Sequence, residues 1–333
     1  MVFFETSEIW RSAASTGIWF AMSDANANAI KRLVIAGGSG FLGSGLIRHL
    51  SAVAQSAVVL TRGPARDVGS VRFVAWDAKT IGPWEEELEG ASAIVNVVGR
   101  SVDCRKTTAN KAAILDSRVD SVNVLGQAVK RCSSPPPVWI QSGTAHIYGD
   151  TDDQILDESS PVGTGFAPQV GLAWEAALAE LALPSVRTVM LRISFVLGRD
   201  GGALATLSRL ARLGLGGGIG TGRQFISWIH ETDLHRIIHR AIVDDSMRGV
   251  YVVTAPNPVP NRDFMRLLRR AVHRPWSPPV PAVLVRIGSV ILRTDPELAL
   301  LGRRCVPTRI MHEGFTFQFP NLEGALADLL GGD

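Results

Sequence analysis

A glycine motif near the start of the chain constrains the fold more than any other feature. Residues 33–35 (Leu-Val-Ile) form a short apolar run, as a buried parallel strand requires. Gly37, Gly40 and Gly43 follow at three-residue spacing, and the residues after them have the periodicity of a helix. A strand, a glycine turn and a helix in this order place backbone N–H groups where a pyrophosphate can bind. The motif predicts a nucleotide-binding βα unit, and the alternative is an ordinary strand–helix turn.

The three glycines have separate predicted roles in such a unit. Gly37 allows the tight turn, Gly40 the close approach of the phosphate, and Gly43 the contact between helix and strand. The residues predicted to contact a bound dinucleotide in this motif are Gly37, Gly38, Ser39, Gly40, Phe41, Leu42 and Gly43.

The composition is that of a protein with a sizeable core. The 333 residues are enough for one large α/β domain with a smaller appended unit. Hydrophobic residues make up 46% of the chain and charged residues 20%, which is ordinary for a globular protein. The net charge is only +3, and basic residues are not concentrated as on a nucleic-acid or membrane surface. We therefore expect neither nucleic acid nor a membrane as a partner.

The cysteines and histidines indicate no metal site. Cys104, Cys132 and Cys305 are far apart, and none of the seven histidines pairs with a cysteine or carboxylate at ligand spacing. We expect reduced thiols, which are typical of a cytoplasmic protein.

Residues 1–30 precede the predicted first strand. We expect a disordered leader, or a mis-assigned start with translation beginning at a later methionine. Residues 9–22 are too short and too polar to span a membrane, and the basic start of a secretory signal is absent. The Ser, Ala and Arg content leaves import into an organelle open, although Glu5, Glu8 and Asp24 count against it. The predicted location is cytoplasmic.

Apolar strand-like segments alternate with helical ones after the glycine motif. The predicted strands are residues 33–35, 57–61, 71–75, 93–98, 138–141 and 186–193. Residues 109–131, between two of these strands, have helical periodicity. The alternation predicts an α/β fold with a doubly wound, Rossmann-type parallel sheet, in which ligands bind outside the carboxyl ends of the strands.

The character of the chain changes after about residue 195. Residues 213–222 form a glycine-rich loop, either beside a ligand or on the plain surface, and predicted helices follow at 261–273 and 282–292. We therefore predict three parts. They are the leader (1–30), a dinucleotide-binding domain (31–200) to which later segments return, and a substrate-side loop with a small C-terminal domain (201–333).

Several long motifs resemble one protein family over residues 31–331. They include Ala-Gly-Gly-Ser-Gly-Phe-Leu-Gly at 36–43, Val-Leu-Gly-Arg-Asp-Gly-Gly-Ala-Leu at 196–204 and Gly-Arg-Gln-Phe-Ile-Ser-Trp-Ile-His at 222–230. With them the chain resembles the extended short-chain dehydrogenases/reductases, in the sugar-nucleotide epimerase-like branch called epimerase family proteins. Its tail, around residues 306–320, resembles the small C-terminal domain of unknown function of that branch.

Arg62, directly after the second strand, favours NADP(H) over NAD(H). NAD-binding folds usually have an acidic residue there, on the ribose 2′-hydroxyl, whereas Thr61 and Arg62 suit a 2′-phosphate. A solvated arginine is the alternative. The family resemblance implies further cofactor contacts, at Asp77, Val97, Val98, Arg118 and Val196. Asp77 has a turn cap as its alternative role, and Arg118 a surface ion pair.

The catalytic pair that is usual in this superfamily is absent. A tyrosine acts there as general acid/base, and a lysine four residues later lowers its pKa. The residue four positions after Tyr148 is Asp152, and the residue four positions after Tyr251 is Ala255. No lysine follows Lys130.

Thr144 and Tyr148 are the predicted catalytic residues. Matching the chain to the epimerases through Tyr148 puts the usual tyrosine near Gln169 and the usual lysine near Ala173. Thr144 stands where the family has its catalytic Ser or Thr, and its alternative role is a hydrogen bond that closes the strand end. Without a nearby lysine, we expect Tyr148 to keep a pKa near its ordinary value of about 10.

Arg223, Trp228 and His230 are the predicted substrate-binding residues. The resemblance places Arg223 where extended members bind a nucleotide-sugar phosphate, and the other two belong to the same motif. For Trp228, stacking on the substrate competes with a place in the core. His146 and Glu158 are further candidates, each with a structural role as the alternative.

The sequence leaves two functions open. One is an NADP(H)-binding, epimerase-like oxidoreductase that acts on a nucleotide-sugar-like small molecule without the usual Tyr-Lys pair. The other is a non-catalytic NADP(H)-binding sensor, regulator or assembly scaffold. The resemblance also implies a homodimer through helices at 109–131 and 170–182, whose apolar residues are Ile114, Val122, Leu125, Leu172, Ala176 and Leu178. The alternative is that these residues only cover the sheet of their own chain.

Overall fold

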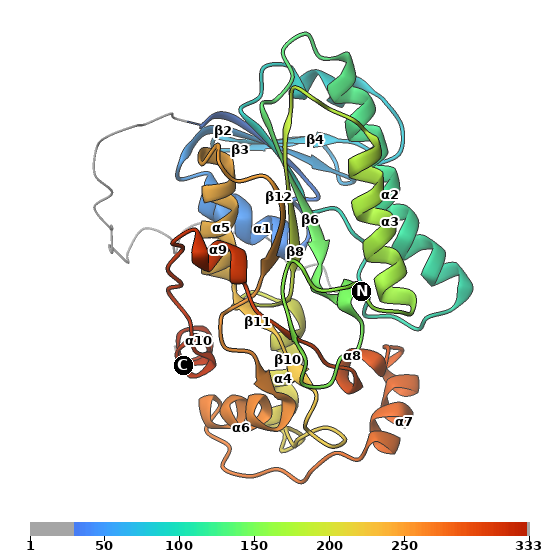
Figure 1. Cartoon of the computed structure of the whole chain (residues 1–333), viewed down its shortest axis with the longest axis vertical. Helices are drawn as coiled ribbons and strands as arrows, with labels where there is room; N and C mark the ends of the chain where they lie inside the picture. Colours follow the sequence, from blue (N-terminus) through green and yellow to red (C-terminus); the bar gives the residue numbers. More distant parts are fainter. Residues whose placement is uncertain (1–29, 332–333) are drawn as a thin grey trace.

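A computed structural model of the protein describes residues 30–331 (Figure 1). The predicted leader therefore lies outside the described residues, except for Ile30, which begins the first strand. The three cysteines are free thiols, as expected. No helix in the described part is long and apolar enough to cross a membrane.

The centre of the molecule is an eight-stranded sheet with the order β12-β8-β6-β5-β1-β2-β4-β3. Neighbouring strands are parallel except β3 and β4, which pair antiparallel at one edge. The strands are β1 (Ile30–Ala36), β2 (Ala54–Thr61), β3 (Arg66–Val68), β4 (Val71–Ala75), β5 (Ala93–Asn96), β6 (Val138–Thr144), β8 (Arg187–Ile193) and β12 (Gly249–Val253). The chain builds the sheet outward from β1 in one direction and then in the other, which confirms the predicted Rossmann-type fold.

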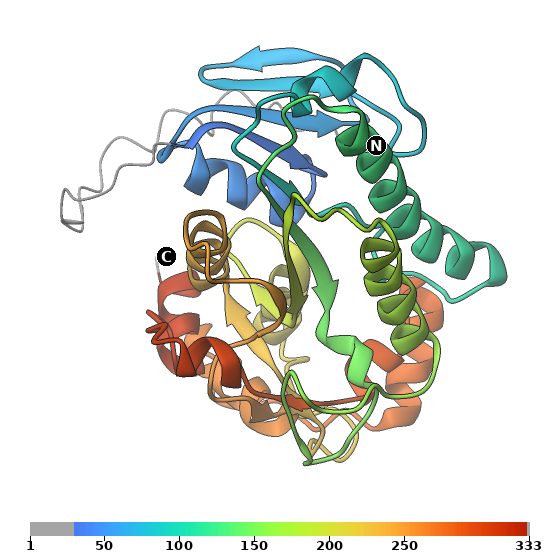
Figure 2. The ribbon, with the colours of Figure 1, turned by 45° about the horizontal axis from the view of Figure 1, so that its top comes forward.

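Helices cover both faces of the sheet (Figure 2). The helices are α1 (Phe41–Leu50) and α5 (Glu231–Val243) on one face, and α2 (Thr108–Arg131) and α3 (Phe166–Glu180) on the other. Successive side chains of a strand point to opposite faces. Leu33 and Ile35 of β1 accordingly pack toward α1 and α5, whereas Val34 packs toward α2 and α3. The continuous apolar run of β1 therefore serves two cores.

A smaller region lies beyond the carboxyl ends of the strands, below the sheet in Figure 1. Its short strands pair as β9 (Phe195–Leu197) with β11 (Trp228–His230), and β10 (Phe225–Ile226) with β13 (Val259–Pro260). A third pair, β7 (Ile155–Leu156) with β14 (Arg304–Cys305), joins the C-terminal segment to the chain that follows β6. The remaining helices are α4 (Gly202–Arg212), α6 (Asn261–Ala271), α7 (Ala282–Leu292), α8 (Glu297–Leu300), α9 (Thr308–His312) and α10 (Leu322–Leu330), with 3₁₀ turns at η1 (Pro83–Leu88) and η2 (Ala145–Tyr148). The predicted domain boundary near residue 200 stays a prediction.

Most of the apolar residues predicted to form a dimer interface belong to the core of the monomer. The buried ones are Ile114, Val122, Leu125 and Leu178. Leu172 and Ala176 are exposed on α3. Because a side chain buried against its own sheet cannot also contact a partner, these four residues do not support the predicted dimer. The oligomeric state itself stays a prediction.

Candidate functional site

Two of the three motif glycines are required by the fold itself. Gly37 has a φ of +85°, and a Cβ there would lie 2.9 Å from the backbone nitrogen of Val98. A Cβ at Gly43 would lie 2.4 Å from Cα of Gly38 and 2.6 Å from the carbonyl oxygen of Gly37. Gly43 therefore lets α1 pack on the turn, rather than on the strand as the sequence predicted. The glycine turn itself packs against the backbone of Val97 and Val98, which follow β5.

Gly40 is different, because the protein leaves open space around it. It is the N-cap of α1 with a φ of −84°, a conformation that any residue adopts. A Cβ at Gly40 would meet only the carbonyl oxygen of Gly37, at 3.6 Å. The first turn of α1 has no acidic residue and no side-chain cap, so its N–H groups and the positive end of the helix dipole are available to an anion.

Phe41 connects the glycine turn to the second region of the molecule. A Cβ at Gly198 would lie 2.7 Å from the Phe41 ring, and a Cβ at Gly202 would lie 2.9 Å from it. The Gly-Arg-Asp-Gly-Gly sequence at 198–202 is therefore glycine-rich because the ring packs there. Leu42 is also partly buried against the core. At these two positions the backbone, rather than the side chain, is available to a cofactor.

Arg62 lies beside this turn with an unpaired guanidinium. Thr61 is buried at the end of β2, and its Oγ1 accepts a hydrogen bond from the backbone nitrogen of Gly63 at 3.2 Å. Arg62 is exposed, and it forms no hydrogen bond or ion pair with residues 30–331. The neighbouring strands β1 and β2 thus end in the glycine turn and in a free cation, respectively.

Asp77 caps the turn that follows β4. Its carboxylate accepts hydrogen bonds from the backbone nitrogens of Thr80 and Lys79, both at 2.8 Å, and from the Thr80 hydroxyl at 2.7 Å. These bonds lower the pKa of Asp77 to about 2. The turn cap, which was the alternative role, is therefore present, and the exposed carboxylate keeps unused acceptor capacity.

Arg118 is a desolvated cation near the end of β5. Its Nη1 donates to the carbonyl oxygens of Ile114 at 2.8 Å and Arg100 at 3.1 Å, and the guanidinium lies 4.9 Å from the Trp174 ring centroid. Burial lowers its pKa to about 10. No carboxylate in the described part pairs with it, so the alternative of a surface ion pair is wrong.

The three valines predicted to contact the cofactor differ in accessibility. Val97 and Val98 leave β5 beside the glycine turn, and Val98 donates its backbone N–H to the Asn96 side chain at 3.1 Å. This bond ends β5 at Asn96, two residues before the predicted end. Val196 is buried in the core on the α1–α5 face, so only its backbone is available to a ligand.

Thr144 ends β6, where its Oγ1 accepts a hydrogen bond from the backbone nitrogen of His146 at 3.1 Å. This is the strand-closing bond that was the alternative role. The bond uses the hydroxyl only as an acceptor, and Thr144 is half-buried. Its O–H therefore remains available to donate to a substrate oxygen.

Tyr148 has the environment of a structural residue. It is buried, its hydroxyl donates to the carbonyl oxygen of Asp157 at 2.7 Å, and it accepts from Nη1 of Arg192 at 2.8 Å. Glu175 holds Arg192 through two bonds of 2.8 and 2.9 Å. Burial raises the pKa of Tyr148 to about 12 although Arg192 opposes the shift, so the expected value near 10 is wrong.

Trp228 and His230 pack in the interior and do not face a substrate. Trp228 is fully buried, and its Nε1 donates to the carbonyl oxygen of Asn257 at 3.1 Å. His230 caps α5 through Nδ1, which accepts from the backbone nitrogen of Thr232 at 3.0 Å, and its ring stacks on Phe319. Their predicted role in substrate binding is therefore not supported, because both side chains are buried and bonded within the protein.

Arg223 remains available to a substrate, whereas Glu158 does not. Arg223 is exposed, and its guanidinium forms no ion pair with the described residues. The Glu158 carboxylate accepts hydrogen bonds from the backbone nitrogens of Val252 at 2.9 Å and Arg309 at 3.3 Å. Glu158 thus has the structural role that was its alternative.

Arg303 is a desolvated cation near the end of β6 that the sequence did not predict. Nε of Arg303 donates to the carbonyl oxygen of Gly149 at 3.0 Å, and burial lowers its pKa without a paired carboxylate in the described part. Burial, together with the charges of Arg303 and Lys106, lowers the pKa of His146 well below its usual range. The ring is therefore neutral near pH 7. Lys106 itself pairs with Asp295 at 3.0 Å.

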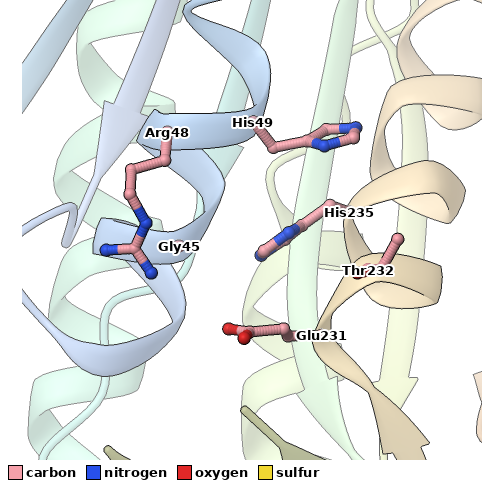
Figure 3. Close-up of a pocket in the computed structure, with 6 residues that line it drawn as sticks. All are labelled: Gly45, Arg48, His49, Glu231, Thr232 and His235. Atoms are coloured by element: carbon pink, nitrogen blue, oxygen red, sulfur yellow. The ribbon is translucent and has the colours of Figure 1, made fainter. Parts of the chain in front are cut away.

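A polar cavity lies between α1 and α5 (Figure 3). Its volume is about 250 Å³, and it is lined by Gly45, Arg48, His49, Glu231, Thr232 and His235. The ring centroids of His49 and His235 are 5.3 Å apart. A Cβ at Gly45 would lie 3.0 Å from the His235 ring, so the glycine makes room for it.

His235 is expected to make the stability of the protein dependent on pH. Burial, with smaller contributions from His49 and Arg48, lowers its pKa to about 3. The unfolded chain, with a pKa of about 6.5, then binds a proton that the folded protein does not, so the free energy of unfolding falls as pH falls below that value. This one group lowers it by about 2 kcal/mol between pH 7 and pH 5. In urea titrations, the free energy of unfolding of His235→Gln should fall less between pH 7 and pH 5 than that of the wild type. His273→Gln, at an exposed position, is the control and should behave like the wild type. An equal fall in the wild type and both variants would contradict the assignment to His235.

Comparison with known proteins places this geometry in a family. Residues 33–253 match the family described as NAD dependent epimerase/dehydratase, and residues 280–329 match a domain of unknown function, DUF1731. Epimerase family protein SDR39U1 of Bos taurus is 32% identical over 304 residues, which cover 90% of this chain and 99% of that protein. Epimerase family protein YfhF of Bacillus subtilis is 31% identical over 301 residues, which cover 90% and 97% of the two chains.

Solved structures agree with this match. The crystal structure of human epimerase family protein SDR39U1 (isoform2) with NADPH is 30% identical, with a TM-score of 0.81 over 90% of this chain and 99% of that chain. MoeE5 in complex with UDP-glucose and NAD is 20% identical with a TM-score of 0.71, over 90% of this chain and 97% of that one, which shows a common fold. The chain therefore belongs to the NAD dependent epimerase/dehydratase family, as the sequence motifs predicted, and residues 280–329 form a DUF1731 domain.

Proposed function

We propose that this protein binds NADP(H) across the carboxyl ends of the sheet strands. The main support is the open side of the glycine turn at Gly40, with the free guanidinium of Arg62 after the next strand. The pyrophosphate would bind the first N–H groups of α1, and Arg62 would pair with the 2′-phosphate. A relative of 30% identity was solved with NADPH, which supports this choice of cofactor.

We further propose that the protein is an epimerase-like oxidoreductase for a small molecule that carries an anionic group. A bound nicotinamide would exchange a hydride with such a substrate. Arg303 near the end of β6 and the exposed Arg223 are cations without a carboxylate partner in the described residues, and they would bind the anionic group. Thr144 would donate a hydrogen bond to the substrate oxygen that gains or loses charge.

The proposed site lacks an efficient general acid for proton transfer. Tyr148 has a pKa of about 12 and a hydroxyl that is already bonded to Asp157 and Arg192. Gln169 and Ala173, at the usual catalytic positions, supply neither an acid nor a cation. A general acid works best when its pKa is near the working pH, so we expect slow turnover. The same observation favours a second candidate function, a non-catalytic NADP(H)-binding sensor or scaffold.

Single-turnover oxidation of NADPH with a broad panel of aldehydes, ketones and nucleotide sugars separates these functions. We expect tight binding of NADPH and slow oxidation that Thr144→Ala slows at least about tenfold, because orientation is lost. Tyr148→Phe should leave the rate unchanged and lower the free energy of unfolding by about 1–3 kcal/mol, because Asp157 and Arg192 lose a buried partner. Tight binding without any oxidation would favour the sensor. Rapid oxidation that neither variant changes would show that the site lies elsewhere.

A further inference from the structure

Helix α7 has an apolar face that the rest of the described chain leaves uncovered. Val283, Leu284, Ile287, Val290 and Ile291 occupy positions i, i+1, i+4, i+7 and i+8, which lie on one side of a helix. Their exposed fractions range from 53% for Ile287 to 75% for Ile291. A row of five exposed aliphatic side chains on one helix is unusual for a surface that faces only water.

Exposed apolar side chains also occur in two segments that precede α7 in the chain. Trp276, in the connection between α6 and α7, is 71% exposed, and Leu213 and Leu215 of the glycine-rich loop are also exposed. The two segments run side by side, because Gly220 donates its backbone N–H to the carbonyl oxygen of Val280 at 2.9 Å. Figure 1 shows the α6–α7 connection running along the lower end of the molecule and leading into α7.

We call this set the α7 surface: Leu213, Leu215, Trp276, Val283, Leu284, Ile287, Val290 and Ile291. These eight residues are half of the sixteen large hydrophobic side chains that are exposed in the described part of the chain. The exposed apolar side chains are therefore concentrated at one end, rather than scattered singly as on an ordinary surface.

The segment that carries most of the α7 surface is strongly cationic. Between Asp263 and Asp295 the chain has six arginines and no acidic residue. The exposed arginines that form no ion pair with the described residues are Arg270, Arg274, Arg286 and Arg293. The overall net charge of +3 does not indicate this cationic segment, because acidic residues elsewhere in the chain balance its positive charge.

The α7 surface is held firmly against the main domain. Arg105, which follows β5, donates its backbone N–H to the carbonyl oxygen of Arg293 at 3.1 Å and its Nη2 to that of Val290 at 2.6 Å. Lys106 pairs with Asp295 at 3.0 Å just after the helix. The apolar face is thus presented on a helix that is fixed at its C-terminal end.

We propose that the α7 surface docks on an anionic lipid membrane, with α7 lying in the plane of the headgroups. An apolar helix face with an exposed tryptophan enters the headgroup region, and arginines beside it attract acidic lipids. A second copy of the chain fits less well, because a two-fold interface would bring two copies of this cationic segment together. This proposal differs from the expectation of no membrane partner, which was drawn from the overall charge, and it does not rest on the proposed catalytic function.

Flotation of the full chain with vesicles tests this proposal. We expect at least about tenfold more protein on phosphatidylcholine vesicles containing phosphatidylglycerol at about 30 mol% than on pure phosphatidylcholine vesicles. The bound fraction should fall as salt is raised, because salt screens the arginines. Leu284→Glu with Ile291→Glu, and separately Arg274→Gln with Arg286→Gln, should each remove most of the binding.

Matched variants on other surfaces control for charge and exposure. Val243→Glu at the end of α5 and Arg248→Gln before β12 should leave vesicle binding unchanged, and circular dichroism should show that all variants are folded. Absence of binding to the anionic vesicles would overturn the proposal, as would binding that the control variants reduce as much as the α7 variants do. Concentration-dependent dimers in analytical ultracentrifugation that Leu284→Glu with Ile291→Glu abolishes, without vesicle binding, would instead assign the surface to a second copy.

Discussion

Replacing Gly40 with aspartate is expected to weaken NADPH binding by at least about 100-fold while leaving the thermal stability equal or slightly higher. The fold leaves space for a Cβ at Gly40, whose nearest neighbour would be the carbonyl oxygen of Gly37 at 3.6 Å. Aspartate is a better N-cap than glycine, and its charge suits the N-terminus of α1. The same charge would repel a pyrophosphate. If the pyrophosphate binds at Gly40, calorimetric titration should therefore show a lower affinity for NADPH in Gly40→Asp, whereas a thermal melt should show an equal or higher melting temperature.

Two further variants separate charge, space and folding. Gly40→Asn has the same size and capping ability without the charge, so it should weaken binding less than Gly40→Asp. Gly43→Ala should reduce stability as well as binding, because its Cβ would lie 2.4 Å from Cα of Gly38. Unchanged affinity for NADPH in Gly40→Asp would place the pyrophosphate elsewhere.

Replacing Arg62 with aspartate is expected to reverse the preference for the phosphorylated cofactor. NADPH should bind about 100-fold more weakly, because a guanidinium that pairs with the 2′-phosphate is replaced by a repelling carboxylate. NADH should bind nearly as before, or more tightly, since a carboxylate at this position can accept a hydrogen bond from the ribose hydroxyl. Stability should not change, because Arg62 is exposed and forms no ion pair with the described residues.

Arg248→Asp is the matched control, because it makes the same charge change just before β12, the edge strand that lies on the other side of β1 from β2. It should weaken both cofactors equally and only slightly, through the long-range field. If Arg62→Asp weakened NADPH and NADH by the same factor, Arg62 would not read the 2′-phosphate, and the choice of NADP(H) would lose its basis in this chain.

Side-chain direction explains most of the errors at the site. Thr144, Tyr148, Trp228 and His230 all stand in motifs next to strand ends, where a family resemblance implies contact with ligands. The structure leaves Thr144 half-buried with its hydroxyl proton unused, but it directs Tyr148 toward Arg192 and packs Trp228 and His230 in the interior. Nothing local in the sequence distinguishes these cases, because each depends on which distant segment packs over the residue.

The sequence by itself determined the elements whose causes are local. The strand, the glycine turn and α1 lie within about twenty residues, and sterics between near neighbours decide their geometry. The parallel sheet also follows, since buried strands alternate with helices. Only the tertiary structure decided the position of Arg303 near the end of β6 and the uncovered face of α7. Arg303 bonds to Gly149 across 154 positions, and α7 is apolar on a face that a sequence pattern would assign to the core. Contacts between distant segments, and their absence, arise from how the whole chain packs, and no short pattern encodes that.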